Sequence, residues 1–187
     1  MEFTLIYQGS LKANGSVEDK QHIRREFHKQ LAELWKQEPL SYMRDMDFLK
    51  DNPPSDSTTI IQNVSSFRFA PLVCTKLYLV AELDIIFLRP ESPGRIVTQG
   101  GDIDNRLKTL FDALRMPKET KEIPKGDCPK SGEDPFYCLL EDDNFIVKLA
   151  VKTDRLLSSS CGQSHVNLMI HVQTKALIAT YANASLG

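Results

Sequence analysis

The sequence predicts a single domain of the α/β (α+β) class, in which a small mixed β-sheet packs against two main helices. Two segments place apolar residues at the spacing of amphipathic helices, and several others show the alternating or continuous apolar residues of strands. The chain has 187 residues, of which 41 % are apolar and 26 % are charged, as in an ordinary globular protein with a hydrophobic core. We therefore expect residues 1–187 to form one domain, with an inserted loop at 116–137.

The first half of the chain is expected to hold one long helix among strands. Ser16-Val-Glu-Asp19 resembles a capping box, and the apolar residues after it recur at helical spacing, which predicts a helix over 17–38. Residues 39–70 show no periodicity apart from one short strand, and Asn52-Pro-Pro-Ser is a clear breaker. The strands expected here lie at 3–8, at 58–64 and, as a central strand, at 77–88.

A second helix is expected over 104–115, after a loop at 90–101. Its apolar residues recur on one side and predict a buried stripe of Leu107, Leu110, Phe111 and Leu114. The segment 116–137 is rich in Lys, Glu, Pro and Gly and is long for a loop in a compact domain. It is therefore expected to be a functional flap or partly disordered.

The last third of the chain alternates between strands and turns. Residues 145–152 and 166–172 alternate apolar and polar side chains, which predicts two strands, the second with one face toward water. A polar turn is expected between them at 154–164. Residues 174–185 are expected to end the chain as a short helix.

One side of the first predicted helix is basic, and two interpretations of it are open. The side chains can form a solvated helix face, or they can contact phosphate groups of a ligand. The residues concerned are Lys20, Arg24, Arg25, His28 and Lys29.

Bulk charge and cysteine usage limit the functional class. The formal net charge of −2 is not the strongly basic balance of a typical nucleic-acid-binding protein, so a phosphate-binding surface must be local or include a metal ion. The four cysteines, at 74, 128, 138 and 161, have no zinc-site spacing. Free thiols are expected, although Cys128 and Cys138 would be able to pair in an oxidising compartment. With no signal peptide and no membrane-length apolar segment, we expect a cytoplasmic protein that does not enter a membrane.

The most informative segment is Gly-Asp-Ile-Asp-Asn-Arg-Leu-Lys-Thr-Leu-Phe-Asp-Ala-Leu, at 101–114. It sets Asp102 and Asp104 two residues apart at the start of a helix, with Lys108 one turn further on the side of Asp104. A second acidic group, Glu141-Asp142-Asp143, precedes an apolar strand. Clustered carboxylates repel one another unless a cation joins them, and Mg²⁺ prefers oxygen ligands of this kind. The sequence therefore predicts a carboxylate metal site that acts on phosphate.

Each part of this pattern also has a structural interpretation. Asp104 can be a helix cap, and Lys108 with Asp112 can form an i, i+4 ion pair of about 0.3–0.5 kcal/mol. The run Glu141-Asp142-Asp143 can be a turn. The occurrence of all three features together favours the metal site.

The motif Asp-Ile-Asp-Asn-x-x-Lys-x-x-x-Asp-Ala-Leu, followed by Asp-Asp before a strand, resembles the RusA family of Holliday junction resolvases. The resemblance is specific over residues 101–115 and 139–152 and implies a dimeric, Mg²⁺-dependent (or Mn²⁺-dependent) endodeoxyribonuclease that cuts branched DNA. It implies metal ligands at Asp102, Asp104 and Asp143 and a catalytic lysine at Lys108. Side chains expected to contact DNA are Asn105, Arg106, Lys118 and Lys121.

Three features depart from the family: the greater length, the segment 116–137 between the two acidic motifs, and the slightly acidic charge. They leave open a nuclease for other DNA structures, or a DNA- or partner-binding module that has lost cleavage. A Mg²⁺-dependent enzyme acting on small phosphates is a further alternative. The lack of a GxxxxGK[ST] loop counts against nucleotide hydrolysis.

Overall fold

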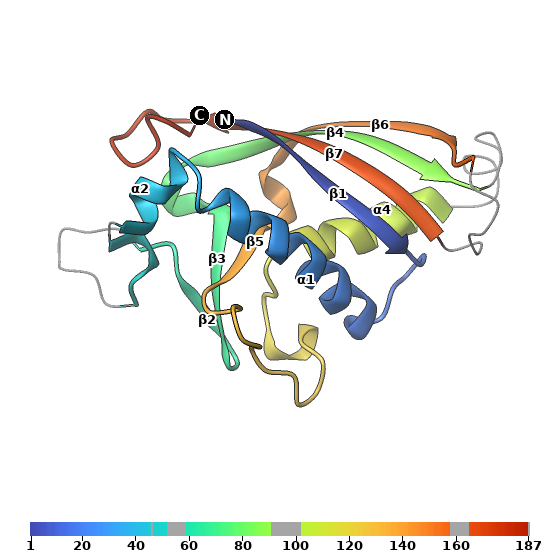
Figure 1. Ribbon diagram of the computed structural model, residues 1–187, viewed down its shortest axis with the longest axis horizontal. Coiled ribbons are helices and arrows are strands. Elements are labelled where there is room, and N and C mark those ends of the chain that lie inside the picture. The colour runs from blue at the N-terminus through green and yellow to red at the C-terminus, as the bar shows by residue number, and fades with distance from the viewer. Residues whose placement is uncertain (46, 52–58, 91–101, 158–164, 187) are drawn as a thin grey trace.

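The structure, a computed structural model, combines two β-sheets with helices that lie on one side of the larger sheet (Figure 1). This architecture confirms the predicted mixed α and β class. The residues that the structure describes are 1–45, 47–51, 59–90, 102–157 and 165–186. Most of the loop expected at 90–101 and of the turn expected at 154–164 lies outside these residues.

The larger sheet has four strands in the order β1-β7-β4-β6. β7 pairs antiparallel with β1 and with β4, whereas β4 and β6 are parallel. The strands are β1 (Glu2–Ser10), β4 (Leu79–Arg89), β6 (Ile146–Arg155) and β7 (His165–Ala176). The four strand predictions that fall in this sheet are confirmed, including the central position of β4.

The helices cover one face of this sheet and leave the other open. In Figure 1, α1 (Val17–Leu34) and α4 (Asp102–Leu114) both lie beneath the sheet, and no described helix lies above it. The covered face forms the core, with side chains of β7 at alternate positions fully buried. On the open face, Ile6, Met169 and Ile86 are opposite one another on neighbouring strands and are each 39–49 % exposed.

The first helix begins as the capping box predicts. The Ser16 hydroxyl accepts a hydrogen bond from the Asp19 N–H at 3.2 Å, and the Asp19 carboxylate accepts one from the Ser16 N–H at 3.0 Å. The helix ends at Leu34, not at 38, because the last turn tightens into i→i+3 bonds from Lys36 and Gln37. Pro39 follows closely, and the residue before a proline disfavours the helical conformation.

Residues 39–70 contain more regular structure than the sequence predicts. Besides α2 (Leu40–Asp45), they contain β2 (Gln62–Val64) and the start of β3 (Phe67–Val73). These two strands form the smaller sheet with β5 (Phe136–Leu140), and β3 lies in its centre. β3 and β5 were both missed. Pro71 sits inside β3, and proline is unusual in a central strand.

The expectation for the C-terminus was also wrong. β7 continues to Ala176, and residues 177–186 form bends and turns without a helix. The Asn183 side chain holds this segment by donating hydrogen bonds to the carbonyls of Leu77 and Ile178, at 2.7 and 2.8 Å.

Cys74 and Cys138 are buried, Cys128 is exposed, and all three are free thiols. Cys128 and Cys138 therefore do not form a disulfide. Burial raises the pKa of the Cys74 and Cys138 thiols to about 12, so both stay protonated at neutral pH. Among the described residues, no helix has both the length and the apolar character that crossing a membrane requires.

Candidate functional site

The start of α4 presents two side chains of the predicted site to solvent. Asp104 and Lys108 are both exposed and lie one turn apart, on the same side of the helix. α4 begins at Asp102, so Asp104 is the third residue of the helix and not its cap. The side chain of Asp102 lies outside the described part of the structure.

The structural interpretations of these two residues are not observed. Asp112 pairs with Lys20 at 2.7 Å and with Arg115 at 2.9 Å, and not with Lys108. Within the described residues, neither Asp104 nor Lys108 takes part in an ion pair. Both side chains are therefore available to a ligand.

The adjacent face of α4 packs against the segment between β1 and α1. The Gly15 N–H donates a hydrogen bond to the Thr109 hydroxyl at 2.9 Å, and a Cβ on Gly15 would lie only 2.7 Å from the Thr109 methyl. The Arg106 side chain is buried and donates a hydrogen bond to the Leu11 carbonyl. Asn105 is half-buried. Since the Arg106 side chain is only 8 % exposed, its position does not favour the DNA contact expected of it.

The second acidic motif forms a turn between β5 and β6, as its structural interpretation predicted. The Glu141 carboxylate accepts a hydrogen bond from the Thr75 N–H at 2.7 Å, and Asp142 caps a 3₁₀ turn, η4 (Asp143–Phe145), by accepting from the Asn144 N–H at 3.0 Å. Asp142 also forms an ion pair with Lys118. Asp143 is exposed.

The two neighbouring aspartates have opposite pKa shifts. At Asp142, partial burial opposes ionisation, but the Lys118 ammonium and the Asn144 N–H outweigh it and lower the pKa to about 2. At Asp143, partial burial and the nearby Asp142 carboxylate raise the pKa. When two carboxyl groups lie close together, their pKa values move apart. The second negative charge is harder to form beside the first.

The structure does not bring Asp104 and Asp143 together within one chain. The residue after α4, Arg115, forms a β-bridge with Leu140, and the Met116 N–H donates to the Leu140 carbonyl at 2.9 Å, so η4 follows directly from the C-terminal end of α4. Asp104 lies eleven residues before Arg115, which corresponds to about 16 Å along the helix axis. In Figure 1, η4 is the orange turn beside the C-terminal end of α4. In the described part of the chain, no group of three or more His, Cys, Asp or Glu side chains is placed to hold a metal ion.

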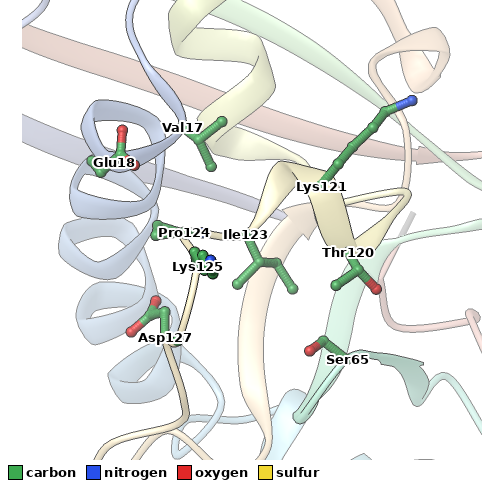
Figure 2. Close-up of a pocket in the computed structure, with 10 residues that line it drawn as sticks. Val17, Glu18, Ser65, Thr120, Lys121, Ile123, Pro124, Lys125 and Asp127 are labelled. Atoms are coloured by element: carbon green, nitrogen blue, oxygen red, sulfur yellow. The ribbon is translucent and has the colours of Figure 1, made fainter.

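The two lysines expected to contact DNA lie in the segment 116–137, near different partners. Lys118 lines a cavity of about 510 Å³ together with Asp142 and Asn144. Lys121 pairs with Glu119 at 2.7 Å and borders a second cavity of about 660 Å³. Figure 2 shows Ile123 in the middle of this second cavity, with Lys121 extending away from it. The second cavity includes neither acidic motif.

The basic side of α1 is not a uniformly solvated face, because Lys29 is exposed but its neighbours bind other parts of the chain. Arg24 and His28 are buried, at 2 % and 4 % exposed, and they bind other parts of the chain. Arg24 donates hydrogen bonds to the carbonyls of Asp112 and Arg115, at 2.7 and 3.0 Å, and so satisfies the C-terminal end of α4. Sequence analysis missed this role, although Arg24 directly follows Ile23 of the apolar stripe.

The segment 116–137 is held by the same side of α1. Arg25 pairs with Asp127 and Glu133, each at 2.9 Å. His28 accepts a hydrogen bond from the Tyr137 N–H at 2.9 Å through Nδ1, which leaves Nε2–H to donate to the Gly132 carbonyl at 3.1 Å. The segment is therefore anchored to α1 over its second half, whereas its first residues, Met116 and Lys118, bind Leu140 and Asp142.

The carboxylates supply the donor type that a hard divalent cation requires, but one chain divides them between the two ends of α4. In comparisons with protein-family models, curated proteins and solved structures, no match to this chain was found.

Proposed function

We propose that this protein is a metal-dependent endodeoxyribonuclease that cuts branched DNA such as a Holliday junction. The observation that carries the proposal is the exposed pair Asp104 and Lys108 at the start of α4, with no partner among the described residues, inside a motif that also contains Asp102. By contrast, Asp112 on the same helix pairs with Lys20 of α1 at 2.7 Å. The resemblance to the RusA family supports the same assignment.

The proposed site would use Mg²⁺, or Mn²⁺, held by Asp102, Asp104 and Asp143. When bound, such an ion would activate water as a nucleophile and stabilise negative charge on the leaving oxygen of a phosphodiester. Lys108 would neutralise charge on the scissile phosphate. Asn105, Lys118 and Lys121 would contact the DNA backbone. We further propose that the protein acts in the cytoplasm as a homodimer, whose two-fold symmetry matches a four-way junction.

A second candidate function is a DNA- or partner-binding module without catalysis. It is favoured by one observation, the separation of Asp104 from Asp143 within the chain. It does not explain why Asp104 and Lys108 are both exposed and form no ion pair with another described residue.

The test is incubation with labelled four-way junction, flap and linear duplex, with and without Mg²⁺. We expect cleavage of the branched substrates with Mg²⁺ or Mn²⁺, and none with EDTA. Ca²⁺ should support binding but little cutting, because it tolerates looser geometry. Asp104→Asn should abolish cleavage and leave DNA binding equal or tighter, since it removes a negative charge near phosphate.

Lys29→Ala is the matched control for this variant, because Lys29 is exposed on α1 and pairs with Glu26. It should cleave as the wild type does. Cleavage that persists in EDTA, or in Asp104→Asn, would refute the metal site. Binding without cleavage under every metal condition would favour the binding module.

A further inference from the structure

We infer that the protein has a second ligand site, a cavity of about 590 Å³ that takes an organic phosphate such as a nucleotide. The cavity lies between the end of α1, α2 and residues 130–137, and its lining includes Trp35, Lys36, Arg44, Lys130 and Tyr137. None of the described residues of the two acidic motifs is among its lining residues. The inference therefore goes beyond the proposed nuclease and does not rest on it.

Two hydrogen-bond donors on the wall of this cavity have no partner in the described structure. Trp35 is fully buried, and its indole N–H binds no other group. The Tyr137 hydroxyl also makes no hydrogen bond to a described residue, although Tyr137 is only 9 % exposed. The two rings stack with their centroids 5.3 Å apart, so they form one rigid part of the wall. Buried donors nearly always have an acceptor, and an oxygen of a ligand in the cavity would supply one.

The carboxylates of the lining are already occupied. Each pairs with a cation of the same chain, Glu33 with Lys36, Glu133 with Arg25 and Asp134 with Arg68, at 2.6, 2.9 and 2.6 Å. By contrast, Lys130 is exposed and forms no ion pair with another described residue. The cavity therefore offers donors and positive charge, which is the environment that an anionic group with several acceptor oxygens requires.

Arg44 brings a second cation close to the Tyr137 hydroxyl. Burial raises the pKa of Tyr137, and the Arg44 guanidinium partly opposes this shift, so the hydroxyl is a donor at neutral pH. A phosphate monoester carries three acceptor oxygens and a charge of about −1.5 to −2 at pH 7, which suits two cations and a hydroxyl together. The volume lies within the range of about 300–1,000 Å³ for sites of organic ligands, so there is room for more than the phosphate group.

The end of α1 does not prevent an anion from binding here. The C-terminal end of a helix carries about half a negative elementary charge, which is less than the combined charge of Lys130 and Arg44. The carbonyls of Glu33 and Leu34 in this last turn already accept hydrogen bonds from the N–H groups of Lys36 and Gln37, at 3.1 and 3.0 Å.

The test uses the fluorescence of Trp35, which is the only tryptophan of the chain and therefore reports on this cavity. Adenosine monophosphate is titrated in EDTA, so that phosphate cannot bind through a metal ion at the proposed nuclease site. We expect a saturable change in Trp35 emission and the same Kd by isothermal titration calorimetry. Adenosine, which lacks the phosphate, should bind at least about tenfold more weakly. Equal binding of adenosine would overturn the inference, as would the absence of saturable binding by both methods.

The phosphate group can belong to a free nucleotide or to the end of a DNA strand, and a second titration separates the two sources. It compares one single-stranded oligonucleotide with a 5′-phosphate and with a 5′-hydroxyl. A change in Trp35 emission with the 5′-phosphate form alone would place the end of a strand in the cavity, and a change with adenosine monophosphate alone would place a free nucleotide there. Both results support the site. Equal changes with the two oligonucleotides, and none with the nucleotide, would overturn it.

Two variants test the residues of the cavity. Lys130→Gln removes a charge, and Tyr137→Phe removes a hydroxyl but keeps the backbone bond to His28, so neither breaks an interaction between described side chains. Each should weaken binding of adenosine monophosphate about tenfold, with an unchanged circular dichroism spectrum. Lys125→Gln is the matched control, because Lys125 is an exposed lysine of the same segment at a different cavity. Unchanged binding in both cavity variants, or equal weakening in the control, would overturn the assignment.

Discussion

Among single residues, His28 shows how a polar side chain on α1 becomes part of the protein interior. Its two ring nitrogens bind backbone groups of different segments, at Gly132 and Tyr137, so one neutral tautomer satisfies both. Burial lowers the pKa of His28 below the ordinary value of 6.5, although the nearby Glu133 carboxylate partly opposes this and Arg25 adds to it. Protonation of His28 would also put a hydrogen on Nδ1, which would then face the Tyr137 N–H, and the hydrogen bond between them would be lost.

This arrangement predicts that acid weakens the fold. Because the pKa is lower in the folded than in the unfolded protein, the unfolded state binds more protons between the two values. The contribution of His28 is therefore complete above pH 6.5 and is lost as the pH falls from there toward the folded-state pKa. Urea unfolding at a series of pH values between about 7 and 5 should show a falling free energy of unfolding. His28→Gln, which cannot titrate, should show a smaller slope, and an equal slope would contradict the prediction.

At the scale of elements, the two main helices depend on each other through Arg24. The last carbonyls of a helix have no partner within it, and α4 ends inside the protein, where Ala113 and Leu114 are each 1 % exposed. The guanidinium of Arg24 supplies hydrogen bonds to two of these carbonyls, and its third polar contact is with Gln21 at 2.5 Å. Burial lowers the pKa of Arg24, but the group remains charged at all ordinary pH values.

Replacing Arg24 should therefore destabilise the whole domain. Arg24→Ala leaves buried carbonyls unpaired, which costs about 3 kcal/mol of unfolding free energy. Arg24→Lys should recover only part of this, because an ammonium cannot reproduce the planar fork of guanidinium donors. Chemical denaturation measures the unfolding free energy of both variants. Lys29→Ala, on the exposed side of α1, is the control and should change that free energy by less than about 0.5 kcal/mol. A similarly small effect of Arg24→Ala would support the solvated helix face that the sequence suggested.

At the scale of the whole molecule, two apolar positions on opposite faces of the larger sheet stay exposed within the described structure. Leu149 of β6 lies opposite the buried Leu83, on the face that the helices cover elsewhere, and Met169 of β7 lies on the open face between Ile6 and Ile86. The two residues have almost the same exposure, 42 % and 45 %, but they lie on opposite faces of the sheet. They therefore form a matched pair for locating a subunit interface.

We expect the proposed homodimer to form through β6, an edge strand of the larger sheet that exposes Leu149 and Val147. Leu149→Arg should place a charge in the interface and convert the protein to a monomer, without unfolding it, because the side chain is already half exposed. Met169→Arg should leave the dimer intact. Light scattering at micromolar concentration, with and without junction DNA, separates the outcomes. A dimer that survives Leu149→Arg and is lost in Met169→Arg would instead place the interface on the open face.

The sequence by itself determined the features that depend on neighbouring residues. The capping box at Ser16, the apolar stripe of α4 and the alternation in β7 are all local patterns, because a helix or a half-buried strand repeats its environment every few residues. The exposed positions of Asp104 and Lys108 follow from the same helical periodicity. The mixed fold class follows from the order of these elements.

Only the tertiary structure decided which distant residues meet. β3 and β5 carry too little local signal to be recognised, and they form a sheet because they pair with each other across more than sixty residues. Arg24 and His28 on the basic side of α1 are buried because the end of α4 and the segment 116–137 pack against them. For the same reason, spacing in the sequence was unable to show that α4 holds the two acidic motifs apart. The distance between two side chains on different elements depends on how those elements pack, and not on the motif that contains them.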